Sequence, residues 1–243
     1  MFSRWEFSLV ALVILVSSVA PSFALAEGTM RVGIAGFAGF NSYGMKDVND
    51  ELIAPLNASL AASGIPISLN DISSGLGFGG GLHALVRDKW MVLLDYERLL
   101  ATSSDKGDVS GTPVELEVKT PANGFTLTGV YMLPSTSKTR FGFGAGVGYY
   151  STGSHLKVTA AGSDTSASFD AKGPGFHGVA MADIAASDVV HVEGAVGYRY
   201  AKSGQVEDSD GAKLVNSDGS ESKIDWSGFI ARLGLTAYLG KKQ

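Results

Sequence analysis

The sequence contains no cysteine, so neither a disulfide framework nor a thiolate metal site is possible. Charged residues are also scarce, at 18% of 243 residues compared with about 25% in typical soluble domains. The formal net charge of −5 provides no basic surface for nucleic acid. We therefore expect no nucleic-acid partner.

Long apolar runs are absent after the first 26 residues. Arg4 precedes the apolar stretch 9–16, and a small-residue stretch ends at Ala24-Leu25-Ala26. This order is typical of a secretory signal peptide, and the apolar stretch is shorter than the ~20 residues of a membrane-spanning helix. We expect residues 1–26 to be a signal peptide cleaved after Ala26, and residues 27–243 to form one domain.

The rest of the chain alternates apolar with small or polar residues between clusters of turn residues. A period of two is typical of β-strands. The pattern predicts eight strands, near residues 29–41, 74–86, 89–102, 113–133, 139–158, 166–186, 188–202 and 223–239. Eight is an even number, as in single-chain bacterial barrels.

The connections between these strands differ in length. Tight turns are expected at Arg87-Asp88 and Ser187-Asp188, and long polar loops at 42–73 and 203–222. A longer connection is also expected around 103–112 and a polar loop near 159–165, with a turn at 134–138. In outer-membrane barrels, short turns face the periplasm and long loops face outward. The fold class predicted is all-β, an eight-stranded antiparallel up-and-down transmembrane β-barrel in the bacterial outer membrane.

One face of each predicted strand is apolar and suits lipid. The residues expected to face lipid include Val92, Leu94, Phe143, Val147, Leu233 and Leu235. Aromatic residues near the strand ends on this face are expected to form interfacial girdles, namely Trp90, Tyr96, Tyr131, Tyr149, Tyr198 and Tyr200. The glycines of 75–81 and 142–148 are expected to point inward, where they leave a cavity or make room for bulky neighbours.

The inward faces also carry charges of both signs. The predicted lumen network consists of Asp95, Glu97, Asp183, Glu193, Arg199 and Arg232, with His83, His177 and His191 on the same faces. Because an unpaired buried charge is costly, opposite charges in a narrow lumen should pair and plug it. The alternative is a site for a polar ligand or an ion.

A short helix is expected in the first external loop. Met45, Val48, Leu52, Leu56 and Leu60 follow helical spacing, and Pro55 should bend or divide the helix. This helix could cover the barrel mouth, contact outer-leaflet lipid or bind a partner helix.

Two short motifs resemble catalytic or cofactor-binding motifs, but the elements around them do not support either function. Residues 75–80 match G-x-G-x-x-G but lie inside a strand pattern instead of opening a helix. Ser154 and His155 are neighbours on a strand and so point to opposite faces. No histidines have zincin spacing, and the acidic loop 207–221 lacks the EF-hand pattern. We expect no enzymatic activity, no cofactor and no metal site.

With its signal peptide, alternating strands and loop lengths, the chain resembles the small bacterial outer-membrane β-barrel families of the OmpA membrane domain, OmpX and OmpW. The resemblance covers essentially all of residues 27–243. It implies outer-membrane lipid and the barrel assembly machinery as partners. That machinery usually recognises a final aromatic residue, whereas this last strand ends Tyr238-Leu239-Gly240.

Two functions fit these features. The first is a structural or surface-interaction barrel with a largely plugged lumen, whose loops could contact an extracellular ligand. The second is a narrow channel for small or apolar solutes. A soluble periplasmic barrel that carries a ligand is a third possibility, and it would require the apolar faces to point inward.

Overall fold

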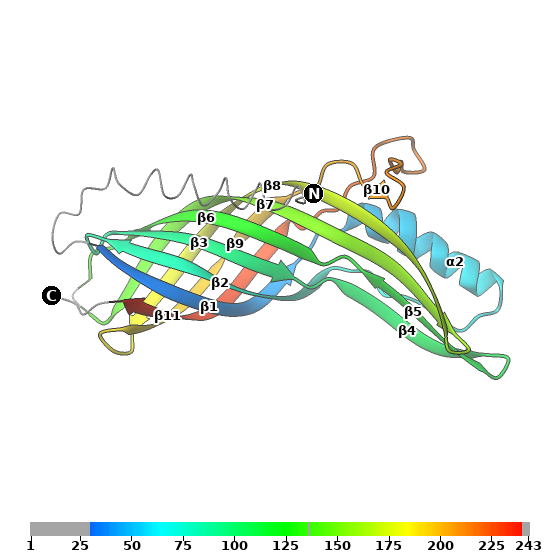
Figure 1. The fold of residues 1–243 in the computed structure, drawn as a ribbon, viewed down its shortest axis with the longest axis horizontal. Helices are drawn as coiled ribbons and strands as arrows, with labels where there is room; N and C mark the ends of the chain where they lie inside the picture. Colours follow the sequence, from blue (N-terminus) through cyan, green and yellow to red (C-terminus); the bar gives the residue numbers. More distant parts are fainter. Residues whose placement is uncertain (1–29, 136, 240–243) are drawn as a thin grey trace, which may run out of the picture.

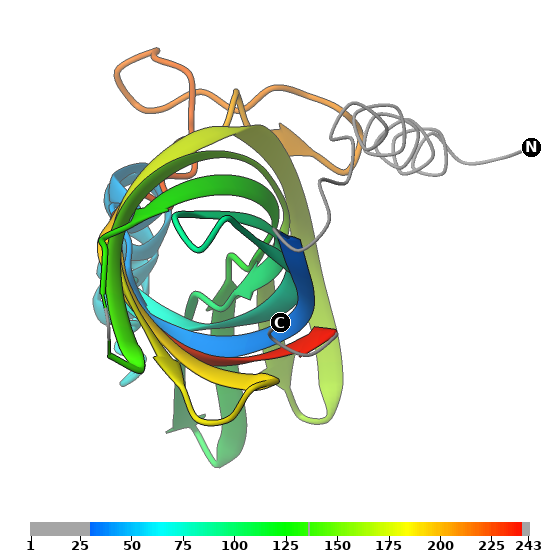
Figure 2. The same ribbon diagram turned by 90° about the vertical axis from the view of Figure 1, so that its left-hand side faces the viewer.

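The structure is a computed structural model that describes residues 30–135 and 137–239. The predicted signal peptide and its cleavage position lie outside these residues. Eight antiparallel strands close a ring in the order β1, β2, β3, β6, β7, β8, β9, β11 and back to β1 (Figures 1 and 2). Their bounds are Met30–Ser42, Ser74–Val86, Trp90–Leu99, Ala122–Met132, Thr139–Ala160, Ser163–Ala185, Val190–Ala201 and Gly228–Leu239.

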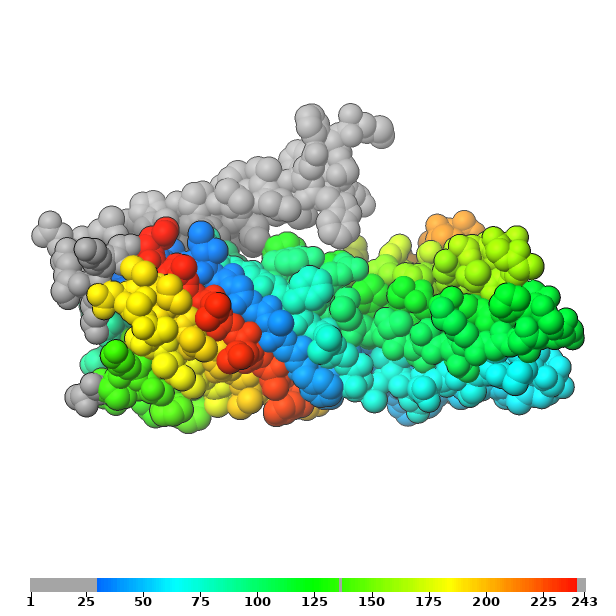
Figure 3. Space-filling view, turned by 90° about the horizontal axis from the view of Figure 1, so that it is seen from below, coloured from blue at the N-terminus to red at the C-terminus, as the bar shows by residue number. Residues whose placement is uncertain are grey.

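The first and last strands complete the ring. β1 pairs with β11 from Val32 opposite Leu239 to Asn41 opposite Ile230, and the two strands slant side by side across the wall in Figure 3. The described ends of the chain, Met30 and Leu239, therefore lie at the same end of the barrel, together with the tight turns at 87–89 and 186–189. We call this the turn end, and the opposite end the loop end.

The β2–β3 turn shows why the short connections fit this topology. Arg87 and Asp88 have φ angles of 51° and 53°. Two successive left-handed residues are typical of a type I′ hairpin turn, whose twist matches that of the strands it joins. The turn predicted at Arg87-Asp88 is confirmed.

The outer face of the barrel is apolar, as predicted. Leu233 is 65% exposed and Phe143 61%, and Val92, Val147 and Leu235 are also exposed, whereas Leu94 is partly exposed. Aromatic pairs stand at two levels: the rings of Trp90 and Tyr131 are 5.1 Å apart near the turn end, and those of Tyr96 and Phe125 are 5.2 Å apart towards the loop end. An apolar exterior with interfacial aromatics is the arrangement of a transmembrane barrel of the bacterial outer membrane. The soluble barrel, which required inward apolar faces, is excluded.

Two predicted boundaries are wrong between β3 and β7. Residues 103–112 were expected to be a connection and 113–133 a single strand, but the chain forms a hairpin, β4 (Thr102–Val109) and β5 (Thr112–Lys119), before β6 begins at Ala122. β5 pairs with the far end of β7 and not with the barrel wall around β3. This hairpin extends beyond the loop end in Figure 1.

Two other predicted loops differ in length from the structure, one shorter and one longer. β7 and β8 continue past the barrel to a turn at Ala161-Gly162, so the polar loop predicted at 159–165 is mostly strand. The loop 203–227 includes the short strand β10 (Glu207–Asp208), which pairs with β8, and β11 begins at Gly228 instead of residue 223. We call β4, β5, β10 and the projecting parts of β7 (154–160) and β8 (163–170) the outer sheet.

The helical segment of the first loop changes from a π-helix to an α-helix next to Pro55, but the backbone stays helical through Ile53 and Ala54. η2 (Val48–Ile53), which is π-helical, leads into α2 (Ala54–Ala62), and Pro55 lies in the first turn of α2. None of the helices in the described residues is long and apolar enough to cross a membrane.

Apolar side chains form two cores. The outer core joins the outer sheet, η2 and the loop-end mouth of the barrel; its members are Tyr43, Met45, Val48, Ile53, Ile67, Leu69, Ile72, Leu99, Ala101, Leu116, Val118, Ala122, Tyr150, Ala171, Ala201, Val206, Ile224 and Trp226. The turn-end core lies inside the barrel and consists of Leu85, Met91, Leu93, Val130, Met132, Val179, Met181, Ala195 and Tyr238. The helical segment therefore covers the outer core. Of the three alternatives, a cover at the mouth describes it best.

Candidate functional site: the polar lumen

The centre of the lumen holds charges from strands that are not neighbours in the ring. Asp95 on β3 and Arg232 on β11 point inward, and Arg232 Nη1 lies 3.4 Å from Asp95 Oδ2. The Asp95 side chain has no exposed surface, and its other oxygen lies 3.0 Å from His83 Nε2. β1 and β2 separate the two strands in the ring, so this ion pair spans the interior.

His83 connects this pair to a second carboxylate. Its Nδ1 lies 2.9 Å from Glu193 Oε2, and the Thr236 hydroxyl donates to Glu193 Oε1 at 2.6 Å. His83, Glu193 and Thr236 come from β2, β9 and β11. Side chains from four strands, including Asp95 of β3, thus form one hydrogen-bonded layer.

A second layer lies nearer the loop end. Arg199 on β9 is fully buried; its Nη1 lies 3.4 Å from Glu97 Oε1, and its Nε donates to the Trp226 carbonyl oxygen at 3.0 Å. The Tyr150 hydroxyl donates to Glu97 Oε1 at 2.9 Å, and the Arg199 guanidinium lies 5.5 Å from the Tyr150 ring centre. Because Tyr150 and Trp226 also belong to the outer core, this layer joins the polar lumen to the apolar mouth.

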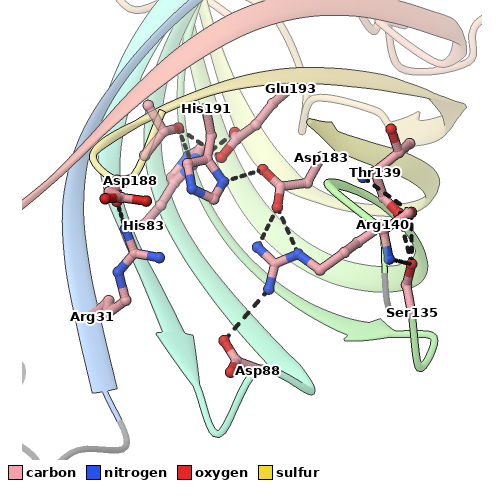
Figure 4. Close-up of polar contacts among 12 residues, drawn as sticks. Arg31, His83, Asp88, Ser135, Thr139, Arg140, Asp183, Asp188, His191 and Glu193 are labelled. Atoms are coloured by element: carbon pink, nitrogen blue, oxygen red, sulfur yellow. Dashed lines mark hydrogen bonds and ion pairs between the residues drawn. The ribbon is translucent and has the colours of Figure 1, made fainter. Parts of the chain in front are cut away.

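A third cluster lies near the turn end (Figure 4). Arg140 forms an ion pair with Asp183, and His191 Nδ1 lies 2.8 Å from Asp183 Oδ1. Arg140 Nη1 also lies 3.6 Å from Asp88 in the β2–β3 turn. Asp183, whose side chain is fully buried, therefore has a charged partner on one side and an imidazole on the other.

The inward glycines make room for these side chains. A Cβ placed at Gly124 or Gly175 would lie 2.6 Å from the ring of Tyr150, and one at Gly148 would lie 3.0 Å from the same ring. A Cβ at Gly146 would lie 2.5 Å from His177 Nε2. These distances are shorter than carbon contacts allow, so the missing side chains accommodate bulky neighbours.

Little space remains in the central layer. A cavity of about 10 Å³ lies beside His83, Glu193 and Arg232, and the Arg232 guanidinium lies 4.7 Å from the Phe37 ring centre. This volume is about what one water molecule needs.

The structure places all six residues of the predicted lumen network inside the barrel. Two of the predicted residue pairs form ion pairs, Asp95 with Arg232 and Glu97 with Arg199. The other two acids have different partners: Glu193 contacts His83, and Asp183 contacts Arg140 and His191. Arg140, Tyr150 and Thr236 are absent from the predicted set. The alternation of β7 could have indicated two of them. Arg140, Tyr150 and the inward glycines of 142–148 occupy alternate positions, so their side chains point to the same face of the strand.

Ser154 and His155 do not form a catalytic pair in the structure. Ser154 is buried and lies 3.1 Å from the Thr152 hydroxyl, while His155 lies on the other face, 3.9 Å from Glu117. Among these residues, no group of three or more His, Asp or Glu side chains is placed to hold a metal ion.

No known family model and no curated protein sequence matches the chain. Similar solved structures include Neisserial surface protein A, with 15% identity over 87% of this chain and 97% of that one and a TM-score of 0.38. The outer membrane protein OprG from Pseudomonas aeruginosa is 12% identical over 86% and 94%, with a TM-score of 0.39. The outer membrane protease OmpT from Escherichia coli is 10% identical over 87% and 95%, with a TM-score of 0.35. No residue role follows from likenesses this distant; the closed sheet and apolar exterior are what make this chain an eight-stranded outer-membrane β-barrel.

Proposed function

We propose that the protein is a structural or surface-interaction barrel whose lumen is largely closed by its own side chains. The observation that carries the proposal is the set of ion pairs across the barrel; the cavity beside Arg232 and Glu193 has a volume of only about 10 Å³. Its exposed parts would then be the lipid-facing wall and the outer sheet with its loops. Outer-membrane lipid and the barrel assembly machinery are the partners proposed with it.

The energetics of the lumen support a closed state. A permeating ion would have to displace Arg232 from Asp95 or Arg199 from Glu97, which leaves a desolvated charge without its partner. The apolar outer core lies on the loop-end side of these layers, and the turn-end side holds the apolar turn-end core together with the Arg140–Asp183 ion pair. The side chains of Tyr150 and His177 occupy the space that the inward glycines leave in the lumen.

The proposal includes no enzymatic activity. Ser154 and His155 lie on opposite faces of β7, so the histidine is not positioned to take a proton from the serine. The charged groups of the central layer are paired with each other and border a cavity of only about 10 Å³.

The test is the substitution Arg232→Ala. It leaves Asp95 buried with only His83 as a partner, so we expect the free energy of unfolding in denaturant to fall by about 3 kcal/mol. It also removes the longest side chain beside the central cavity. The parent protein in planar bilayers should show little conductance, and the variant should show more.

Two controls accompany this experiment. Arg232→Lys keeps the charge and should keep conductance low, and Asp210→Ala, in an exposed loop, should change stability by less than about 0.5 kcal/mol. Steady conductance from the parent, or passage of small uncharged solutes into liposomes, combined with unchanged stability of Arg232→Ala, would reject the closed lumen. The channel for small or apolar solutes would then be the better account.

A further inference from the structure

The apolar outer face of the barrel ends, towards the loop end, in a margin of polar residues whose positive charges lie on one side of the ring. On β3, β8 and β9, the outward side beyond the aromatic girdle carries a cation, respectively Arg98, Lys172 and Lys202. β6 and β7 lie between β3 and β8 in the ring and carry Asn123 and Ser151 at this margin. On β1 and β2 the margin residues are serines, Ser42 and Ser74.

The sheet register places four of these residues in one row. Arg98 lies opposite Asn123, Asn123 opposite Ser151, and Ser151 opposite Lys172. Residues directly opposite each other on one face have Cβ atoms about 4.5–5.5 Å apart. Arg98 Nη1 donates to Asn123 Oδ1 at 2.8 Å, so the guanidinium turns towards β6 and the rest of the row. The row therefore has a cation at each end and hydrogen-bonding side chains between them.

The two terminal cations of this row are available to an anion. The ion pairs among the described residues include Lys202 with Asp225, whose charged atoms are 3.0 Å apart, but neither Arg98 nor Lys172. Lys172 is exposed, and Arg98 uses a neutral amide as its acceptor. Asp170 shares the outward face of Lys172 two positions farther from the barrel wall. An anion would therefore be attracted to the membrane side of Lys172 and repelled from the side of Asp170.

This margin lies where lipid headgroups are expected. Long loops of outer-membrane barrels face outward, so the loop end lies at the outer leaflet. Tyr149 and Tyr200 are the outward residues next to the margin on β7 and β9, and both rings are about half exposed. Outward tyrosines mark the interface between the apolar band and the headgroups. Cations just beyond such rings attract anionic lipid.

An apolar groove lies below the margin on the outer face of β7, β8 and β9. Its volume is about 620 Å³, and its outward lining residues are Ala145, Val147, Phe176, Gly178, Tyr198 and Tyr200. A Cβ at Gly178 would meet only the Gly144 carbonyl oxygen, at 3.9 Å, so the missing side chain leaves open space there. Gly178 is six positions from Lys172 on β8, about 20 Å along the strand and about 15 Å in depth at the usual tilt. One leaflet contributes about half of the ~30 Å hydrocarbon core, so an acyl chain can reach from the margin to this space.

We propose that this side of the barrel binds a phosphorylated glycolipid of the outer leaflet, with phosphates at Arg98 and Lys172 and an acyl chain in the groove of β7, β8 and β9. Arg and Lys donate charge-assisted hydrogen bonds to phosphate oxygens. The two cations are separated by three strand spacings, about 14 Å, so a headgroup with phosphates at both ends reaches both of them. Asn123 and Ser151, between them, can bond to sugar hydroxyls. The site rests on the contact with outer-membrane lipid proposed above, but not on closure of the lumen.

Lipid A, a diphosphorylated glycolipid, is the probe. It is titrated against the full protein in neutral detergent micelles, and bound molecules are counted by native mass spectrometry. We expect one molecule to bind saturably. Lys172→Gln and Arg98→Gln should each weaken binding about fivefold, the effect of one cation at a membrane surface, whereas Lys172→Arg should bind as the parent does. Dephosphorylated lipid A, with the same sugars and chains, should bind the parent and Lys172→Gln equally.

The groove is tested separately from the cations. Gly178→Leu fills the open space without a clash and should weaken binding of lipid A and of its dephosphorylated form by the same factor. Gly194→Leu is the matched control, because a Cβ at this outward glycine of β9 would meet only the Leu233 side chain, at 4.0 Å, outside the groove. Lys138→Gln, at the exposed turn end, should leave the affinity for lipid A unchanged.

Three results would overturn the proposal. They are equal affinity of the parent and Lys172→Gln for lipid A, equal affinity of the parent and Gly178→Leu, and displacement of lipid A by millimolar inorganic phosphate, which would assign the cations to a free anion. Any of these would leave the contact between the barrel wall and lipid standing, since insertion of the parent into lipid bilayers tests that contact independently.

Discussion

Two aspartates illustrate how much a side chain's surroundings decide its role. Asp95 is fully buried and depends on Arg232 and His83 as partners. Asp105, on the exposed β4, instead accepts backbone N–H groups from Ser68 at 2.8 Å and from Lys106 at 2.9 Å. The first carboxylate connects strands across the lumen, and the second ties the chain before β2 to the outer sheet.

The contacts of Asp105 predict a pH-dependent attachment. The N–H of Ser68, and after it that of Lys106, lowers the pKa of the Asp105 carboxyl below its ordinary value of 3.8. Because the folded pKa is the lower one, the contact should persist as pH falls to 3.8 and be lost only below the folded pKa. The amide ¹⁵N–¹H shift of Ser68, followed in an acid titration, should report that loss.

A matched pair of variants tests the same contact. Asp105→Asn should speed hydrogen exchange at the Ser68 amide at neutral pH, because a neutral acceptor binds the N–H more weakly. Asp108→Asn, on the same strand, changes a residue that accepts from Gly111 and should leave Ser68 unaffected. Equal exchange rates at Ser68 in the parent and Asp105→Asn would contradict the assignment.

At the scale of strands, the alternation of apolar and polar residues predicted which way side chains point better than it predicted where strands begin and end. The stretch 113–133 alternates almost without interruption, yet it divides at Thr120-Pro121 into β5 and β6. The break coincides with a proline, which cannot donate to a sheet ladder. The Pro121 carbonyl instead accepts a hydrogen bond from the Thr152 hydroxyl on β7. The proline was a usable signal for the break, but the new partner of β5 was not visible in the sequence.

The lipid-facing side of β11 supports a second prediction. Leu233→Arg should lower the free energy of unfolding from membranes by about 2–4 kcal/mol, as expected for a cation at the middle of the apolar band. Val215→Arg is the matched control, because Val215 has nearly the same exposure but lies in the loop 203–227. Equal effects at both positions would show that the barrel wall does not face lipid.

At the scale of the whole molecule, a barrel and an outer sheet share one continuous set of strands. β7 and β8 pair with each other over their whole length, first in the wall and then in the outer sheet (Figure 1). The outer core is held by residues from η2, β5 and the loop 203–227, whereas hydrogen bonds around a closed ring hold the barrel. The outer part should therefore loosen without loss of the barrel.

Ile53→Asp tests this separation. It buries a carboxylate in the outer core and should open the outer part to trypsin, with cleavage at the exposed Lys46, whose side chain is 81% accessible. Heat-modifiable migration of the barrel should be unchanged, because the ring of strands does not include η2. Ala58→Asp, on the exposed side of α2, should leave the digestion pattern of the parent unaltered. Loss of heat-modifiable migration in Ile53→Asp would show that the two parts fold as one.

The amino-acid sequence alone was sufficient to predict the barrel, the two faces of its strands and its apolar exterior. Side chains in a strand alternate between two faces, and membrane lipid requires one of these faces to be apolar. The sequence also located the charges that point inward. Tertiary structure alone decided which of these charges form pairs. Asp95 and Arg232 are 137 positions apart, and only closure of the ring between β1 and β11 brings them within reach of each other across the lumen. The outer sheet likewise depends on long-range pairing of β5 with β7, which no local pattern specifies.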